Sequence, residues 1–183
     1  MACDISRGRL EPCKDSVGGI NNIYIVNKGA MTVTYDVTDD TLVDSVGVAV
    51  DAYKFEVRGA STYTETPTSS RENGTAFIEQ VLELQLPVLS KEDHKTVREL
   101  VYGSPSIVIE DNNGNLLLSG IEYGLDITGG SIATGAAMGD MSGYTLTFTG
   151  MEKVPANFLL KTSPTESVAT TLTGVGFTVV SGT

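Results

Sequence analysis

Alternation of apolar and polar residues is the pattern that most constrains the fold of this chain. In residues 144–149, Tyr144, Leu146 and Phe148 fall on one face of an extended segment and three threonines fall on the other. Successive side chains of a β-strand point to opposite sides of its sheet, so such a segment is expected to be a strand with one buried face. The same period of two recurs at residues 31–36, 53–58 and 82–86. The sequence therefore predicts a mainly β protein.

A long hairpin is predicted around residues 53–86. The polar segment ASTYTETPTSSRENGT separates its two alternating stretches. The proline and the Asn-Gly dipeptide of this segment favour a turn, whereas its threonines and tyrosine favour extended chain. We place the hairpin tip at Arg71, Glu72 and Asn73 and expect it to be mobile or to be supported by a neighbouring molecule.

One amphipathic helix is predicted over residues 90–102. Ser90 can cap the first turn, and Asp93 stands at the reciprocal capping position. Gly103, with a proline two residues later, ends the helix. Because its apolar residues form a single stripe, the helix is expected to lie on a sheet.

A second turn is predicted at Asn113-Gly114, between two short strands. The polar residues around it have the spacing of an EF-hand calcium loop that begins at Asp111, but Leu116 occupies the sixth position, where the sharp bend requires glycine. We therefore expect a hairpin turn without calcium. One histidine and two cysteines cannot supply the four ligands of a zinc site within one chain, so no metal and no cofactor are expected.

The search for catalytic residues is negative. His94 falls in the first turn of the predicted helix among charged residues, where a solvated histidine is expected. The adjacent acids Asp39 and Asp40 would point to opposite faces of a strand, so they do not form a general acid and base pair. The chain is therefore not expected to be an enzyme, and no catalytic residue is assigned.

Acidic residues outnumber basic ones, with 23 Asp and Glu against 12 Lys and Arg and a net charge of −11. This balance disfavours a protein that grips nucleic acid through its phosphates. The N-terminal residues lack the apolar core of a secretory signal, and no apolar run is long enough to span a membrane. We therefore expect a chain that is made in a cytoplasm, where Cys3 and Cys13 are expected to be free thiols.

The length of 183 residues suits one domain with its own core. We assign residues 1–160 to a β domain and residues 161–183 to a Ser/Thr-rich linker followed by a C-terminal strand. That strand, in the sequence GFTVV, is expected either to join the sheet of its own chain or to add to the sheet of a neighbouring copy.

A glycine-rich segment begins at residue 126 and leads into the alternating strand at residues 144–149. It is not a phosphate site, because two alanines follow its Gly-x4-Gly where a P-loop requires lysine and Ser/Thr, and the Gly-x-Gly-x-x-Gly spacing of a dinucleotide site does not occur. The glycines instead indicate a long loop that lies against a neighbouring subunit. The candidate contact residues are Gly129, Gly130, Gly135, Gly139 and Asp140.

Three segments carry a resemblance to a known family: CDISRGRLEPCKDSVGGINNIYIVN, TSSRENGTAFIEQVLELQLP and DITGGSIATGAAMGDMSGYTLTFTGMEKVPANFL. Together they look like tailed-bacteriophage virion proteins and are most similar to tail tube proteins, also called major tail proteins. The resemblance covers about residues 1–160. It implies a β-sandwich or a rolled antiparallel sheet, with one short flanking α-helix and a long hairpin.

The resemblance also implies a purely structural function in the tail of a virion, assembled in the cytoplasm of a host bacterium. Six copies would close into a ring, and rings would stack into a tube that binds other virion proteins and holds DNA only as non-specific cargo. Hairpin strands would line the lumen, where acids repel phosphate. The candidate lining residues are Glu56, Glu79 and Glu83, although Arg58 on the face of Glu56 could pair with an acid of the next subunit.

Two other functions remain open at this point. The chain could be another virion part, namely a head-to-tail connector, a tail terminator or a capsid decoration protein, which would assemble no further than one ring or the capsid surface. It could also be a monomeric ligand-binding β-sandwich.

Overall fold

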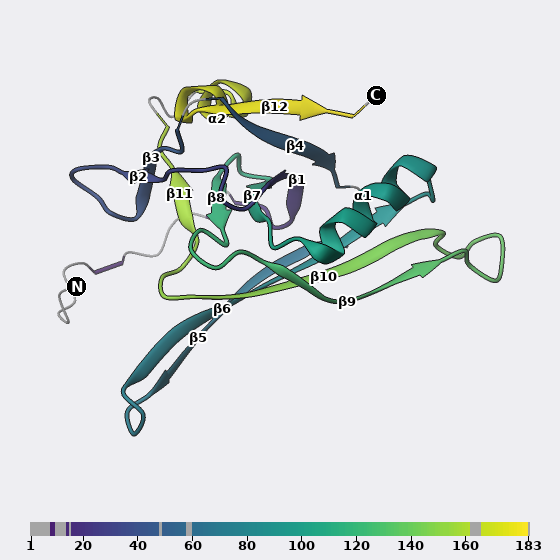
Figure 1. Ribbon diagram of the computed structural model, residues 1–183, viewed down its shortest axis with the longest axis horizontal. Coiled ribbons are helices and arrows are strands. Elements are labelled where there is room, and N and C mark those ends of the chain that lie inside the picture. The colour runs from purple at the N-terminus through teal and green to yellow at the C-terminus, as the bar shows by residue number, and fades with distance from the viewer. Residues whose placement is uncertain are drawn as a thin grey trace.

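Two β-sheets and two α-helices make up the described part of the chain (Figure 1). The structure is a computed structural model that describes residues 8, 9, 14, 16–47, 49–57, 60–161 and 166–182. Strands account for 48% and helices for 12% of it, so the predicted mainly β class is confirmed. Cys3, Cys13 and Arg58 lie outside the described residues. Neither described helix has the length and apolar character that crossing a membrane requires.

The larger sheet has eight strands. In spatial order they are β12 (Phe177–Ser181), β4 (Val50–Glu56), β1 (Ile20–Val26), β7 (Ser106–Asp111), β8 (Leu116–Ser119), β11 (Asn157–Leu159), β3 (Leu42–Ser45) and β2 (Thr34–Tyr35). The neighbouring strands pair antiparallel except for β12 with β4 and β11 with β3, which are parallel.

The smaller sheet has four antiparallel strands, in the order β5 (Thr62–Ser70), β6 (Thr75–Pro87), β10 (Gly143–Glu152) and β9 (Asp126–Ala133). It consists of two long hairpins, β5–β6 and β9–β10, joined along β6 and β10. Figure 1 shows both hairpins reaching past the body of the molecule, with their turns at opposite ends. Strand β10 is the segment in which the alternation of Tyr144, Leu146 and Phe148 predicts a strand.

The long hairpin differs from the one predicted at residues 53–86. Strand β4 pairs with β1 and β12 in the larger sheet, and the hairpin is formed by β5 and β6, with Ser70 opposite Thr75 at its end. The Thr-rich segment, whose threonines and tyrosine favour extended chain, is thus itself the first strand of the hairpin, and the turn falls at the predicted tip, Arg71, Glu72 and Asn73. Strand β5 lies at the edge of its sheet, where a strand needs little apolar surface.

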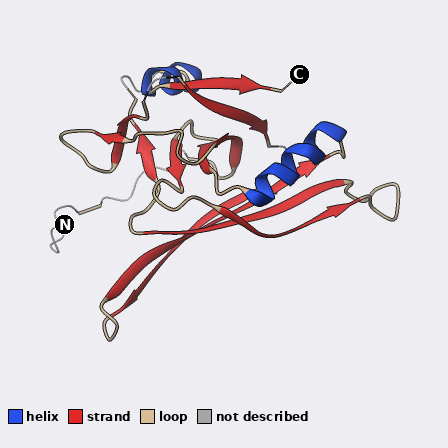
Figure 2. Cartoon of the chain, viewed as in Figure 1, coloured by secondary structure: helices blue, strands red, loops and turns tan. Residues whose placement is uncertain are grey.

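Helix α1 (Lys91–Tyr102) forms where the capping signals predict it (Figure 2). The Ser90 hydroxyl oxygen accepts a hydrogen bond from the Asp93 N–H at 2.9 Å, and the Gly103 N–H donates to the Leu100 carbonyl at the other end. Val97 is the buried residue of the helix. It packs with the inner residues of the four-stranded sheet, and the Tyr144 hydroxyl donates to the Ser90 carbonyl at 3.0 Å.

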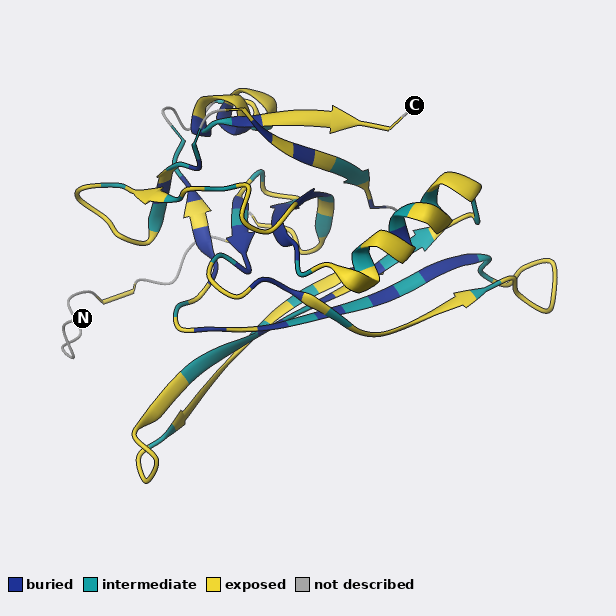
Figure 3. Ribbon diagram, viewed as in Figure 1, coloured by how far each residue is buried: buried dark blue, intermediate teal, exposed yellow. Residues whose placement is uncertain are grey.

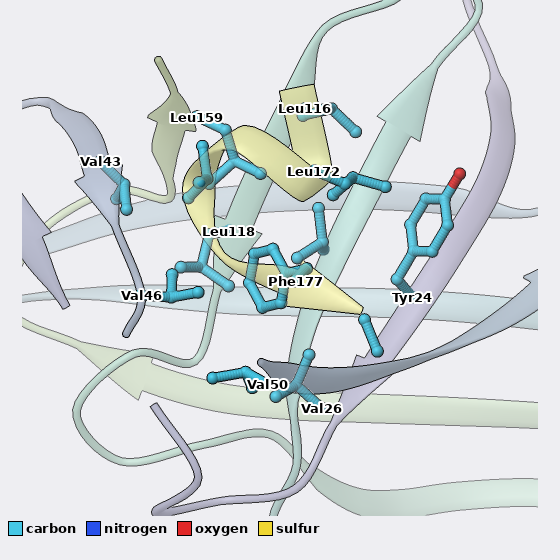
Figure 4. Packing of buried hydrophobic residues seen from close by; sticks show 13 residues of the cluster. Tyr24, Val26, Val43, Val46, Val50, Leu116, Leu118, Leu159, Leu172 and Phe177 are labelled. Carbon is cyan, nitrogen blue, oxygen red and sulfur yellow. The ribbon is translucent and has the colours of Figure 1, made fainter. Parts of the chain in front are cut away.

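A second helix, α2 (Val168–Val175), lies in the region that was expected to be a linker. Its sequence, VATTLTGV, has low helix propensity, and the helix is stabilised by burial of Leu172 and Val175. Gly176 ends it with φ of +116°, and a Cβ there would lie 2.1 Å from the Gly47 carbonyl oxygen. In Figure 4, Leu172 and Phe177 point into the same cluster as Val26 and Val50.

Strand β12 therefore closes the sheet of its own chain. It pairs in parallel with β4, from Phe177 opposite Val50 to Ser181 opposite Lys54. The other edge of β12 has no partner strand within the described residues, so its addition to the sheet of a neighbouring copy stays a prediction.

The eight-stranded sheet is the middle layer of the molecule. Ile23 of β1 and Ile107 of β7 face the four-stranded sheet and α1, whereas Tyr24 and Val108 on the same strands face α2. Both faces of β1 and β7 are buried, which explains why their sequences IYIV and IVI are continuous apolar runs instead of alternating ones. The four-stranded sheet, in contrast, has only its inner face covered (Figure 3).

Candidate functional site

The uncovered side of the four-stranded sheet, called the outer face below, is the most distinctive surface of the described chain. Residues directly opposite each other in an antiparallel ladder share a face. Glu83 is opposite Thr62 of β5 and Thr147 of β10, and Leu82 is opposite Tyr63 and Phe148. The Leu82 side is buried against the body. The outer face therefore carries the residues of the Glu83 side: Thr62, Thr64, Thr66, Thr68, Ser70, Thr75, Phe77, Glu79, Val81, Glu83, Gln85, Thr145, Thr147, Thr149 and Met151.

The charge of this sheet has a single sign. Strands β5, β6, β9 and β10 contain no lysine, arginine or histidine. Glu79, Glu83 and Asp126 stand on the outer face, as their register partners Met151, Thr147 and Thr149 show. The outer face thus presents hydroxyl groups and carboxylates, with the apolar side chains of Phe77, Val81 and Met151 among them, and the carboxylates repel phosphate.

Both edges of the four-stranded sheet lack a partner strand within the described residues. Strand β5 pairs only with β6, and β9 pairs only with β10. Because each of the three ladders is antiparallel, β5 and β9 run in opposite directions, so the β9 edge of one copy could pair with the β5 edge of another and continue the antiparallel order. Unpaired edges of this length are a template for association, and natural proteins usually block them.

Two of the three candidate lining residues lie together on this surface. Glu79 and Glu83 are four residues apart on β6 and share the outer face. The expectation for Glu56 has to be corrected, because it lies on β4 in the other sheet, where its carboxylate is 3.2 Å from Lys54. The sequence analysis grouped them because it paired β4 with β6, and only the long-range pairing of β4 with β1 separates them.

Gly129 and Gly130 do not belong to a loop, contrary to expectation, since both lie within β9. Gly130 has φ of +144°, and a Cβ at this position would lie 2.3 Å from the Thr145 carbonyl oxygen of β10. The strand also bulges at Thr128, whose hydroxyl is 2.8 Å from that of Thr149. Glycine is needed here because the two backbones approach closely at an irregular part of the ladder.

Gly135, Gly139 and Asp140 lie in the loop that joins β9 to β10, at residues 134–142. The Asp140 carboxylate accepts hydrogen bonds from the N–H groups of Ala136 and Ala137 at 2.9 and 2.8 Å, and these bonds lower the pKa of Asp140. The Asp140 side chain therefore stabilises the conformation of its own loop. At its tip the side chain of Met138 is fully exposed.

Arg71, Glu72 and Asn73 occupy the turn between β5 and β6, with Gly74 as its fourth residue. All four residues are exposed. In Figure 3 most residues at the end of this hairpin are exposed on both strands, whereas its base is partly buried against the body. The hairpin tip is thus carried away from the rest of the described chain on two paired strands.

A polar cluster that the sequence analysis missed fixes the base of this hairpin. The Glu65 carboxylate, on the inner side of β5, accepts hydrogen bonds from the Tyr63 hydroxyl at 2.7 Å and from the Ala156 N–H at 2.7 Å. Gln80 donates to the same oxygen and accepts from the Gly120 N–H at 3.0 Å. Burial, followed by the contact with Glu65, raises the pKa of Tyr63. An acid at an inward position of β5 is the only local sign of this cluster.

No group of three or more His, Cys, Asp and Glu side chains is placed to hold a metal within the described residues. Burial opposes ionisation of Asp111, but four hydrogen bonds from Asn115 and Asn113 outweigh it and lower the pKa. The Asp111 carboxylate, at the first position of the EF-hand spacing, therefore stabilises its own hairpin turn.

A shallow depression of about 600 Å³ lies where β10 extends beyond β9. Phe77, Tyr123 and Met151 contribute its apolar surface, and the Lys153 ammonium lies 2.7 Å from Glu122 and 5.6 Å from the centre of the Tyr123 ring. The cation is thus already paired. Open shape and apolar lining suit contact with another surface better than enclosure of a small ligand.

Comparison with known proteins gives no match: the chain is similar to no protein-family model, no curated protein and no solved structure at a level that shows a relationship.

Proposed function

We propose that the chain is a structural protein of a tailed-phage virion that assembles with copies of itself, in the manner of a tail tube protein. The observation that carries the proposal is the four-stranded sheet, whose two edges lack a partner strand in the described chain and whose strands carry threonines and acids but no lysine, arginine or histidine. The sequence resemblance given above supports the same assignment. In this proposal the protein performs no chemistry, and its activity is the geometry of its assembly.

The free edges support closure into a ring. If β9 of one copy pairs with β5 of the next, every copy repeats the same contact and the edges disappear when the ring closes. Such a head-to-tail contact uses two different surfaces of the chain, which is the type of interface that produces rings. The opposite directions of β5 and β9 keep the continuous sheet antiparallel.

The outer face supports a lumen through which DNA passes. Glu79 and Glu83 would place carboxylates around the channel, and Asp126, whose carboxylate accepts a hydrogen bond from the Ser104 hydroxyl at 2.5 Å, would add a third. These carboxylates would repel the phosphates of DNA. The inner face cannot play this part, since it is buried against the body. The projecting β5–β6 and β9–β10 turns would then reach neighbouring copies in the same ring or in an adjacent one.

Negative-stain electron microscopy of the purified protein over a range of concentrations tests the proposal. Stacked rings or tubes are expected. Single rings that never stack would instead favour the connector or terminator function, and attachment only to capsids would favour decoration. A particle that stays monomeric at high concentration would overturn the proposal.

Paired cysteines test which edges meet. Cys3 and Cys13 are first replaced by serine, and cysteines are then introduced at Thr64 on β5 and at Ser131 on β9, with Thr66 and Thr128 as a second pair of positions. Oxidation is expected to give a ladder of covalent oligomers that ends at the ring size, because disulfides form only between closely placed Cα atoms. The matched control joins Thr64→Cys with Thr147→Cys on the central strand β10, which should give no ladder.

A further inference from the structure

The chain contains two Asn-Gly dipeptides, Asn73-Gly74 and Asn113-Gly114, and both lie in hairpin turns. Asparagine followed by glycine is the sequence most prone to spontaneous deamidation, because glycine leaves its own amide nitrogen open to approach by the preceding side chain. In this reaction the glycine nitrogen must reach the asparagine Cγ. The two turns differ in whether these two atoms are free to meet.

The side chain of Asn113 is fixed by three hydrogen bonds. Its Nδ2 group donates to the Val17 carbonyl at 2.8 Å and its Oδ1 accepts from the Val17 N–H at 2.9 Å. Its Nδ2 group also contacts the Asp111 carboxylate at 3.2 Å. The Gly114 N–H, which is the nucleophile, donates to the Asp111 carbonyl at 3.1 Å. Cyclisation at this turn requires all of these bonds to open first.

Asn73 is held only through its backbone, by a 3.3 Å bond from its N–H to the Ser70 hydroxyl. Within the described residues its carboxamide and the Gly74 N–H make no hydrogen bond. Both residues are exposed, and the space around Gly74 contains no atom within 4 Å of an added Cβ. With φ of +63°, Gly74 also keeps the conformational freedom that a side chain would remove.

We propose that Asn73 is a site of spontaneous deamidation and that Asn113 is its protected counterpart. The Gly74 nitrogen loses its proton and attacks Asn73 Cγ, the bond from Cγ to Nδ2 breaks, and ammonia leaves. Water then adds to one of the two carbonyl groups of the resulting succinimide and opens the ring to aspartate or to isoaspartate. No reactant other than water is needed, and asparagine is the labile group.

The modification changes the hairpin tip in two ways. It adds a carboxylate to a turn that holds Arg71 and Glu72, and the isoaspartate product adds one carbon to the backbone path of the turn. Either product alters an exposed, projecting end of the four-stranded sheet. The inference does not depend on the proposed function, because it compares two turns of the same chain.

Peptide mapping by mass spectrometry tests the proposal. The folded, dispersed protein is kept in mildly alkaline buffer at physiological temperature and is then digested with trypsin at lower pH. The fragments 72–91 and 99–153 separate the two asparagines. Asn73 is expected to deamidate roughly tenfold faster than Asn113 or more, since each hydrogen bond that must open slows the reaction several-fold. Equal rates, or a faster Asn113, would overturn the proposal.

Two controls assign the difference to the turns. In denaturant both sites should react at similar rates, because only the native hydrogen bonds distinguish them. In the variant Asp111→Ala, which removes the acid that contacts both Asn113 and Asn115, the folded-state rate at Asn113 should rise while the rate at Asn73 stays the same. If the rate at Asn113 is unchanged in this variant and in denaturant, protection by the turn is wrong.

Discussion

The two sheets of this molecule use the same kind of strand in opposite ways. Strands β1 and β7 of the eight-stranded sheet are buried on both faces, and their backbone groups are paired on both sides. The four-stranded sheet buries one face only and leaves the backbone of β5 and β9 unpaired on one side in the described chain. The eight-stranded sheet also ends in the edge strands β12 and β2, but its central strands are paired and buried on both sides. In the four-stranded sheet, in contrast, two of the four strands keep hydrogen-bonding groups that another molecule could use.

Substitutions of two adjacent residues of β10 are expected to differ most in their effect on the free energy of unfolding. Phe148 is 0% exposed, so Phe148→Ala should lower the free energy of unfolding by about 3–5 kcal/mol through the cavity that it leaves. Thr147→Ala, on the outer face, should cost less than about 1 kcal/mol. Urea unfolding monitored by circular dichroism measures both. Similar losses for the two variants would mean that the outer face is covered.

On β7, in contrast, substitutions of two adjacent residues should both lower the free energy of unfolding by a similar amount. Ile107 and Val108 are adjacent and both 0% exposed, one towards each side of the sheet. Ile107→Ala is expected to cost about 3 kcal/mol and Val108→Ala about 2 kcal/mol. A negligible loss for either variant in the same unfolding experiment would contradict the middle-layer arrangement.

The Glu65 cluster connects the two sheets and should have an intermediate effect. Glu65→Ala removes the acceptor of the Tyr63 hydroxyl and the Ala156 N–H, and an unsatisfied buried donor costs about 1–3 kcal/mol. Glu65→Gln, which keeps an acceptor oxygen, should lose less. The control, Glu83→Ala on the outer face, should change the free energy of unfolding by less than about 0.5 kcal/mol.

Charge reversal on the outer face should leave stability nearly unchanged but alter the interaction with DNA. The double variant Glu79→Lys and Glu83→Lys is expected to retain short duplex DNA at low salt and to release it as salt rises, whereas the unmodified protein retains none. Co-sedimentation of assembled particles with labelled DNA measures this. The matched control reverses Asp44 and Asp51, exposed acids of the eight-stranded sheet, and should not retain DNA to the same extent.

The smallest effect concerns the turn at Asp111. Its pKa is lowered from 3.8 in the folded protein, so its ionised form stabilises the fold at every pH above about 4, and this contribution is lost as the pH falls through the folded value. Asp111→Asn should remove that pH dependence. Unfolding curves of the two proteins should therefore differ by a constant amount above pH 4 and converge below it. A difference that grows on acidification would contradict the lowered pKa.

Features specified by local sequence were predictable. The alternation of Tyr144, Leu146 and Phe148 predicts β10, and Ser90 with Asp93 predicts the start of α1, because a strand face and a helix cap depend on residues a few positions apart. Helix α2 was missed because its threonines and glycine disfavour a helix, and only its packing against the sheet stabilises it.

Features that depend on long-range pairing could not be predicted. Glu56 could be separated from Glu79 and Glu83 only by knowing that β4 pairs with β1. The sequence predicts residues 53–58 as the first strand of the hairpin, whereas β5 takes that place, because an edge strand with threonines on its outer side carries no apolar stripe. Gly129 and Gly130 were read as a loop because the sequence does not show that a close approach to β10 requires glycine.

The absence of lysine and arginine from the four-stranded sheet also determines where trypsin can cut it. Trypsin finds no site inside β5, β6, β9 or β10, and Arg71 in the exposed β5–β6 turn is the only site in the turns of the two hairpins. A single cut there would break the covalent link between β5 and β6. The two strands would remain paired, from Thr62 opposite Glu83 to Ser70 opposite Thr75. The nicked protein should stay folded, and the rate of the cut would then report how often the hairpin tip is covered by another molecule.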